Sequence, residues 1–106
     1  MSEDASVEIS VTDLAARRAA GDVQIVDCRT DDEWDEERIS GSRHIELNEL
    51  AAAAESIGRE QAVVFVCSGG SRSAMAAEAF RTSGFDAYSL AGGLTAWSEQ
   101  GQDLEQ

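Results

Sequence analysis

The chain has 106 residues, enough for one domain with a real core, and 21 acidic residues against 8 basic ones give a net charge of −13. All basic residues are arginines and no basic patch is visible, so a nucleic acid partner is not expected. No apolar run is long enough to cross a membrane, and residues 1–4 do not resemble a signal peptide. The two cysteines, Cys28 and Cys67, form no disulfide framework. We therefore expect a cytoplasmic protein.

The acidic excess without lysine resembles that of proteins from salt-loving organisms, and an ordinary acidic cytoplasmic protein is the alternative. Self-repulsion at this charge weakens the fold in dilute buffer, whereas salt at 1 M shortens the screening length to about 3 Å. If the first interpretation holds, the melting temperature rises strongly between dilute buffer and molar KCl. A flat thermal-unfolding response would favour the ordinary acidic protein.

Strands and helices alternate along the chain. Apolar or alternating runs predict strands at 7–11, 23–29, 63–66 and 87–90, with a very short one between 39 and 45. Helical spacing and terminal glycines predict helices at 12–20, 30–38, 47–57, 73–84 and 94–100, the first capped by Thr12. This order predicts one α/β domain over 1–106, with a frayed 1–6 and an ordered core of about 7–101. A mostly parallel central sheet should carry helices on both faces.

The stretch from Val63 to Ser73 contains the strongest chemical signal. An apolar, β-branched run stops at Cys67, and a loop with two glycines and three hydroxyl residues leads into a helix. Ligands of open α/β sheets bind at this edge, and a helix N-terminus stabilises anions. Cys67 is therefore predicted to be a nucleophile with a lowered pKa. A buried core cysteine is the alternative, but it would not need this loop.

A second polar cluster, Asp27-Cys28-Arg29, ends the strand at 23–29. Asp27 and Arg29 share one face of the strand and are expected to form structural ion pairs rather than to take part directly in chemistry. Cys28 is most simply a core residue, although its position leaves open that it approaches Cys67. The single histidine, His44, has no partner at metal-ligand spacing, so neither a metal nor a cofactor is expected.

Three motifs occur in order over about residues 7–101. The loop 67–73 has the form Cys-x-x-Gly-x-Arg-Ser, residues 27–29 have the form Asp-x-Arg, and residues 92–97 have the form Gly-Gly-x-x-x-Trp. Together they resemble the single-domain rhodaneses, the sulfurtransferase family, and imply its three-layer fold. Residues 37–45 depart from the family's Gly-His-Ile-x-Gly-Ala-x-Asn-Ile stretch, because they keep Ile39, Gly41 and Ile45 but lack the first glycine and the histidine.

The resemblance implies that the Cys67 thiolate takes a sulfane sulfur from thiosulfate or a persulfide donor. The resulting Cys67 persulfide then passes the sulfur to a thiophilic acceptor, a thiol or a protein. The implied substrate-binding residues are those of the loop: Ser68, Gly69, Gly70, Ser71, Arg72 and Ser73. Their backbone N–H groups can hold the persulfide anion.

Individual loop side chains have alternative roles. Arg72 can bind the oxygens of an anionic donor, with a surface ion pair as the alternative. Ser71 and Ser73 can bind the terminal sulfur or cap the helix, and Gly69 and Gly70 shape the loop.

Two other functions stay open. One is a cysteine phosphatase or arsenate reductase of related fold, although those Cys-x5-Arg loops have one more residue before the arginine. The other is a non-catalytic binding or regulatory module, a kind of domain that typically lacks the cysteine. No oligomeric state is predicted.

Overall fold

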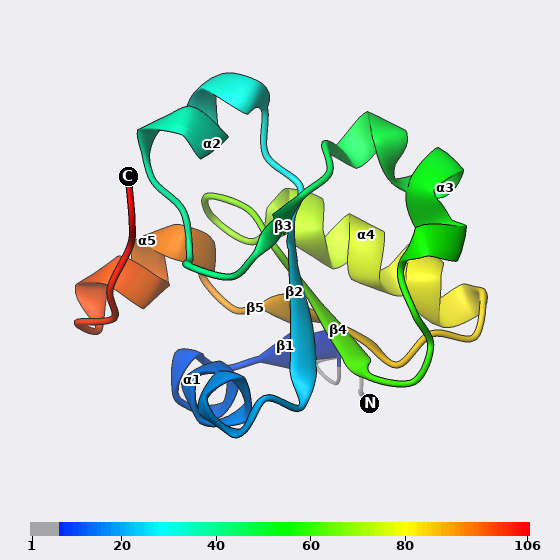
Figure 1. Cartoon of the computed structure of the whole chain (residues 1–106), viewed down its shortest axis with the longest axis horizontal. Coiled ribbons are helices and arrows are strands. Elements are labelled where there is room, and N and C mark those ends of the chain that lie inside the picture. Colours follow the sequence, from blue (N-terminus) through cyan, green and yellow to red (C-terminus); the bar gives the residue numbers. More distant parts are fainter. Residues whose placement is uncertain (1–6) are drawn as a thin grey trace.

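Five parallel strands form one sheet in the computed structural model, which describes residues 7–106. The strand order is β1-β5-β4-β2-β3, and every pairing is parallel. The strands are β1 (Glu8–Ile9), β2 (Val23–Asp27), β3 (Arg43–His44), β4 (Ala62–Val66) and β5 (Ala87–Leu90). Figure 1 shows β2 and β4 side by side in the middle of the domain. The expected frayed residues 1–6 lie outside the described part.

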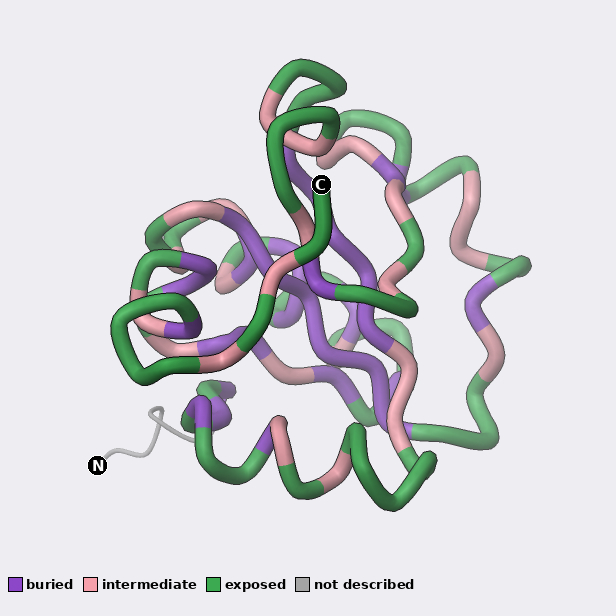
Figure 2. Tube along the Cα trace, turned by 60° about the vertical axis from the view of Figure 1, so that its left-hand side comes forward, coloured by how far each residue is buried: buried purple, intermediate pink, exposed green. Residues whose placement is uncertain are grey.

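Helices cover both faces of this sheet, as predicted. They are α1 (Val11–Ala20), α2 (Asp31–Glu36), α3 (Leu50–Ala53), α4 (Ser71–Thr82) and α5 (Gly93–Glu99). Side chains of β4 alternate between two buried clusters: Val63 and Phe65 pack with α3 and α4, and Val64 and Val66 pack with α1 and α5. Figure 2 shows the buried strands enclosed by partly exposed helices. Within residues 7–106, no helix is long and apolar enough to span a bilayer.

The start of α1 differs from the sequence-based expectation. The Ser10 side chain, not that of Thr12, caps the helix by accepting a hydrogen bond from the Asp13 N–H at 3.0 Å. A cap oxygen reaches the third helical N–H, so the helix begins at Val11. β1 is therefore shorter than the predicted strand at 7–11. Gly21 ends the helix with φ +75°, as its position predicts.

The predicted helix at 47–57 is broken. One turn of α-helix, α3, lies between the 3₁₀ turns Leu47–Glu49 and Ala54–Ser56. Leu50 and Ile57, two apolar residues of the predicted helix, are nevertheless buried. The alanines between Leu50 and Ile57 bury little surface. Tertiary packing therefore does not stabilise a longer regular helix here.

The last residues form more contacts than a polar tail suggests. Arg38 and Glu105 exchange two backbone hydrogen bonds of 2.9 and 2.8 Å, and the Trp97 indole N–H donates to the Asp103 carbonyl at 2.9 Å. These contacts hold the end of the chain against α5 and the segment after α2.

Candidate active site

Cys67 follows β4 directly, and its sulfur faces the N-terminal end of α4. The backbone N–H groups of Gly70 and Ser73 donate to Sγ at 3.1 and 3.4 Å, and the Ser73 hydroxyl lies 3.4 Å from it. The helix begins at Ser71, two residues before the expected start, which brings its first N–H groups to the sulfur. Gly70, with φ +109°, allows the loop to turn back over the strand end. Sγ thus occupies the position of a helix-capping anion.

The balance of two effects sets the pKa of Cys67. Burial raises this pKa, because only 1% of the residue is exposed. Hydrogen bonds from the Ser73 hydroxyl and from the N–H groups of Ser73, Gly70 and Arg72 outweigh burial and lower the pKa below the ordinary 9.0. The environment of Cys67 therefore favours the thiolate, which is the nucleophilic form of cysteine.

The Ser73 hydroxyl is part of a buried network that reaches the next strand. It lies 2.7 Å from the Ser89 hydroxyl on β5 and 3.2 Å from the Gly70 carbonyl oxygen. Its single hydrogen can go to that carbonyl while Cys67 is a thiol and to the sulfur when Cys67 is a thiolate. Both serines are fully buried. Ser89 does not stand out in the sequence; the only signal is one hydroxyl residue among the apolar positions of a short buried strand. Its contact with Ser73 fixes the hydroxyl that faces Cys67.

Ser73→Ala should raise the pKa of Cys67, because the variant lacks the side-chain donor to the thiolate. We expect about a tenfold slower reaction of Cys67 at neutral pH, the effect of losing one hydrogen bond to a charged group. Thiolate absorbance against pH measures the shift. Ser71→Ala is the matched control, since the exposed Ser71 hydroxyl makes no hydrogen bond within residues 7–106. Equal titration curves for the two variants would contradict the assignment.

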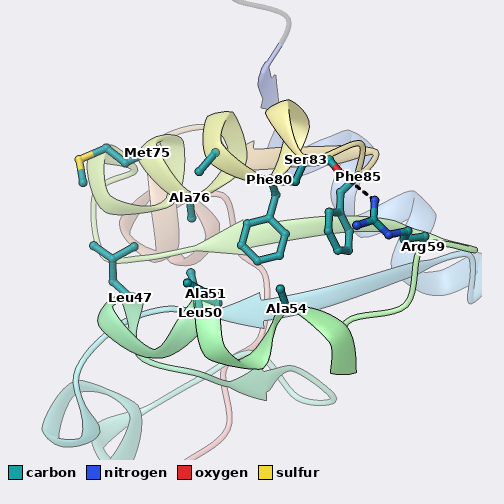
Figure 3. A pocket seen from close by; sticks show the side chains of 11 residues that line it. Leu47, Leu50, Ala51, Ala54, Arg59, Met75, Ala76, Phe80, Ser83 and Phe85 are labelled. Carbon is teal, nitrogen blue, oxygen red and sulfur yellow. Dashed lines mark hydrogen bonds between the residues drawn. The ribbon is translucent and has the colours of Figure 1, made fainter.

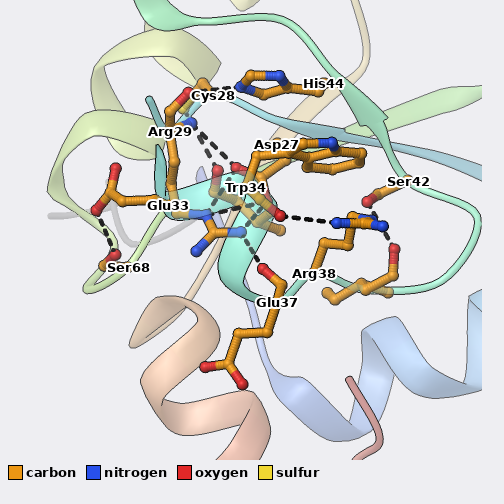
Figure 4. A network of polar contacts seen from close by, with 12 residues as sticks. Asp27, Cys28, Arg29, Glu33, Trp34, Glu37, Arg38, Ser42, His44 and Ser68 are labelled. Atoms are coloured by element: carbon orange, nitrogen blue, oxygen red, sulfur yellow. Dashed lines mark hydrogen bonds and ion pairs between the residues drawn. The ribbon is translucent and has the colours of Figure 1, made fainter. Parts of the chain in front are cut away.

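Glu33 on α2 connects that helix to the loop. Its carboxylate accepts two hydrogen bonds from the Arg72 guanidinium, at 2.9 and 3.1 Å, and one from the Ser68 hydroxyl at 3.0 Å. Figure 4 shows Glu33 reaching from α2 toward Ser68. Of the two roles weighed for Arg72, the structure places it in an ion pair, with about a third of each side chain exposed.

Glu33 is a site residue that sequence reasoning missed. The spacing Thr30-x-x-Glu33 is that of a capping box, and both of its hydrogen bonds are present. That pattern predicts the local position of Glu33 on α2. It gives no indication of the contact with Arg72, which lies 39 residues further along the chain.

In Glu33→Gln, the free energy of unfolding should fall less steeply with decreasing pH than it does in the wild type. The hydrogen bond from Arg72 is the main reason that the pKa of Glu33 lies well below its ordinary 4.5. A carboxyl group whose pKa is lower in the folded protein than in the unfolded one stabilises the fold at pH values above its unfolded-state pKa. This stabilisation is lost as the pH falls toward the folded-state pKa. For this pair, with about a third of each side chain exposed, we expect about 1 kcal/mol.

Urea unfolding at a series of pH values from neutral to about pH 3 measures this effect. Glu36→Gln is the control, because Glu36 lies exposed on the same helix and forms no ion pair among the described residues. A Glu33→Gln variant as sensitive to acid as the wild type would refute the ion-pair contribution.

Asp27 and Arg29 form a buried ion pair with each other, with the shortest N–O distance 2.8 Å. Arg29 also donates to the Glu37 carbonyl just after α2, and its own carbonyl contacts His44 Nε2 at 2.8 Å. The His44 ring stacks on Trp34 of α2, with ring centres 4.9 Å apart. Figure 4 shows these contacts around α2. The Asp27–Arg29 pair therefore positions the helix that carries Glu33.

The two glycines at the start of α5, the N-cap Gly92 and the first helical residue Gly93, explain the Gly-Gly-x-x-x-Trp motif. The N–H groups of Leu94 and Thr95 donate to the carbonyls of Cys67 and Ser68, at 2.9 and 3.1 Å. A Cβ on Gly93 would lie 2.4 Å from both carbonyl oxygens. Only glycine allows this close approach, so the motif holds the first peptides of the active-site loop in place.

Two hollows lie near the loop and differ in character. One, of about 330 Å³, is lined by polar groups including Ser68 and four glutamates, Glu33, Glu36, Glu37 and Glu99. The other, of about 480 Å³, is apolar and lies between the 47–56 segment and α4, with the 60%-exposed Met75 at its edge. Figure 3 shows this second hollow. Cys67 lines neither hollow, and the four carboxylates make the hollow beside Ser68 acidic.

No group of three or more His, Cys, Asp or Glu side chains in residues 7–106 is arranged to hold a metal ion. The chemistry that the described residues support is that of a buried thiolate held by backbone donors. Gly69 and Ser71 form the exposed outer part of the loop.

The fold and the site define a class of protein: a parallel α/β domain with a buried cysteine at a helix N-terminus. Residues 10–100 match the family model described as the rhodanese-like domain. The chain therefore belongs to the rhodanese-like domain family.

The curated relatives described next are 29–39% identical to this chain over the aligned residues. The thiosulfate sulfurtransferase GlpE of Shewanella oneidensis is 35% identical over 92 residues, covering 86% of this chain and 91% of that protein. GlpE of Pseudomonas aeruginosa (strain LESB58) is 39% identical over 75 residues, covering 70% and 68%. The putative sulfurtransferase YtwF of Bacillus subtilis is 29% identical over 91 residues, covering 85% and 88%.

Solved structures share the same fold. A rhodanese-related protein of Thermoplasma volcanium superposes with a TM-score of 0.86 at 26% identity, covering 92% of this chain and 96% of that one. A Rhodopseudomonas palustris protein described as a possible tyrosine phosphatase gives 0.84 at 28% identity, covering 96% and 87%. The second description makes a phosphatase assay a necessary part of any functional test.

Proposed function

We propose that the protein is a sulfurtransferase in which Cys67 carries the sulfur. The observation that supports this most directly is the placement of Cys67 Sγ against the N–H groups of Gly70 and Ser73, in a chain of the rhodanese-like family. These donors favour an anion on sulfur, both the thiolate and the persulfide that replaces it. The relatives named as thiosulfate sulfurtransferases support the same chemistry.

In the first half-reaction, the Cys67 thiolate attacks the outer sulfur of thiosulfate or of a persulfide. An S–S bond forms to Cys67, the donor's S–S bond breaks, and sulfite or the donor thiolate leaves with the electron pair. In the second, a nucleophilic acceptor, a thiol or a protein, attacks the outer sulfur and releases the Cys67 thiolate. The loop from Ser68 to Ser73 surrounds the position of the transferred sulfur at the buried Cys67.

Arg72 can assist an anionic donor with the N–H groups that Glu33 does not occupy, since a guanidinium has five. Only four residues separate Cys67 from Arg72, one fewer than in phosphatase loops of the Cys-x5-Arg kind. The shorter loop favours sulfur transfer over the phosphatase or arsenate reductase alternative. The intact nucleophile and loop also argue against a non-catalytic module. Two free cysteines fit a reducing compartment such as the cytoplasm.

Steady-state transfer of sulfur from thiosulfate to cyanide tests the proposal, with hydrolysis of a phosphate ester measured on the same samples. We expect transfer by the wild type and a loss of at least about a thousandfold in Cys67→Ser, with an unchanged melting temperature. Phosphate-ester hydrolysis that depends on Cys67, without sulfur transfer from thiosulfate or a persulfide, would instead support the phosphatase. Neither activity in a well-folded wild type would support the binding module.

A further inference from the structure

The second cysteine, Cys28, lies beside Cys67 at the same edge of the sheet. β2 and β4 are paired with Asp27 opposite Val66, so the next position along both strands places Cys28 opposite Cys67. The Cys28 N–H donates to the Val66 carbonyl at 2.9 Å, which shows that the pairing continues to this residue. Neighbouring strands lie about 4.8 Å apart. That spacing is within the range of about 4.4–6.8 Å for the Cα atoms of a disulfide.

The side chains of the two cysteines also lie on the same face of the sheet. Both belong to the buried cluster on the α3 and α4 face, each is 1% exposed, and both are free thiols. The Cys28 Sγ lies 3.4 Å from the carbonyl oxygen of Val66, the residue that precedes Cys67. Sulfur transfer to an external acceptor needs only Cys67, so the proposed reaction leaves this second thiol without a role.

We propose that Cys28 resolves the Cys67 persulfide internally and releases the transferred sulfur as sulfide. This rests on the proposed sulfurtransferase function. The Cys28 sulfur attacks Cys67 Sγ, a Cys28–Cys67 disulfide forms, and the bond between Sγ and the outer sulfur breaks. The outer sulfur leaves with the bonding electron pair and takes up the Cys28 proton, so that it is released as HS⁻. The two cysteine sulfurs are oxidised and the outer sulfur is reduced, so no external oxidant takes part.

The loop that holds the persulfide also assists this step. The N–H groups of Gly70 and Ser73 face the sulfur at Cys67 and can stabilise the departing anion. A dithiol reductant then restores both thiols by disulfide exchange. The protein would thereby convert a sulfane sulfur and a dithiol into sulfide, an activity distinct from sulfur transfer to an acceptor.

The environment of Cys28 makes this discharge slow. Burial, and then the charges of Cys67 and Asp27, raise the pKa of the Cys28 thiol to about 12, with Arg72 opposing them. Little Cys28 thiolate exists at neutral pH, so the persulfide survives long enough to meet an acceptor. Only those protein molecules that meet no acceptor then release their sulfur internally as sulfide.

The test loads the protein with inorganic polysulfide, which places sulfur on Cys67 whether or not thiosulfate is a donor. After removal of excess reagent, intact mass and free sulfide are followed without any acceptor. We expect the adduct of about 32 Da to disappear as a species about 2 Da lighter than the reduced protein accumulates, with one equivalent of sulfide released. Peptide mapping should locate the Cys28–Cys67 bond. In Cys28→Ser and Cys28→Val the adduct should persist at least about tenfold longer.

The other outcomes separate this inference from the proposed function. A wild-type persulfide as long-lived as that of Cys28→Val, or a sulfur found on Cys28, would overturn the inference while leaving sulfur transfer intact. Failure of thiosulfate to load the protein, together with sulfide release after polysulfide, would overturn thiosulfate as donor and keep the inference. If polysulfide adds no sulfur, the dithiol oxidant diamide tests the pair directly, and failure to form the lighter species refutes the proposal.

Discussion

Replacing Gly93 by alanine is expected to destabilise the protein by about 3 kcal/mol or more and to abolish the reactivity of Cys67. The new Cβ would lie 2.4 Å from the carbonyl oxygens of Cys67 and Ser68, so the backbone must move. That movement breaks the hydrogen bonds from Leu94 and Thr95 that hold these carbonyls. The residue also has φ +61°, which costs alanine about a further 1 kcal/mol. Urea unfolding and the sulfur-transfer rate measure the two effects.

Gly21→Ala separates the collision from the backbone strain. Gly21 has φ +75°, and a Cβ there would meet no atom within 4 Å. We expect this control to lose about 1 kcal/mol and to keep full activity, because it lies at the far end of α1. If Gly93→Ala were no more damaging than Gly21→Ala, the Gly-Gly motif would not hold the active-site loop.

Arg29→Met is expected to cost about 3–5 kcal/mol of stability. The substitution leaves the carboxylate of Asp27, which is fully buried, without its cation. It also removes the hydrogen bond to the Glu37 carbonyl, which holds the end of α2. Because α2 carries Glu33, the loop should lose a positioning contact and the rate of sulfur transfer should fall as well. Thermal and urea unfolding measure the stability change.

The double variant Asp27→Asn/Arg29→Met tests the cause. With no unpaired charge left in the core, it should be more stable than Arg29→Met alone. Arg43→Met is the surface control, since Arg43 is exposed and, within residues 7–106, its guanidinium donates hydrogen bonds only to Ser56. A double variant as unstable as the single one would show that packing of the arginine, not burial of a lone charge, dominates.

Local sequence patterns predicted most of the fold. Apolar runs identified β2, β4 and β5, and the alternation of strands and helices predicted a parallel sheet covered on both faces. The position of Cys67 followed from the same logic, because a strand, a glycine loop and a helix leave little freedom for the residue at the strand end. The cap at Ser10 was missed because Ser10 and Thr12 are both good caps, and only the geometry of the first turn distinguishes them.

The partners of the site residues were beyond sequence reasoning for a different reason. Glu33 and Arg72, and Ser73 and Ser89, lie 39 and 16 residues apart and meet only after the sheet has formed. The capping-box spacing sets Glu33 apart from the other acidic residues only as a helix cap and does not indicate its contact with Arg72. The 2.4 Å approach at Gly93 likewise depends on how α5 packs against the end of β4. The motif indicated that this glycine matters, and the structure supplies the physical cause.

Intact-protein mass after incubation with thiosulfate tests the central claim most directly. We expect the wild type to gain one sulfur, about 32 Da, and to lose it on addition of cyanide, whereas Cys67→Ser gains nothing. That result would identify Cys67 as the sulfur carrier. A wild type that gains no sulfur from thiosulfate or from a persulfide donor, while its Cys67 thiol remains free, would contradict the account.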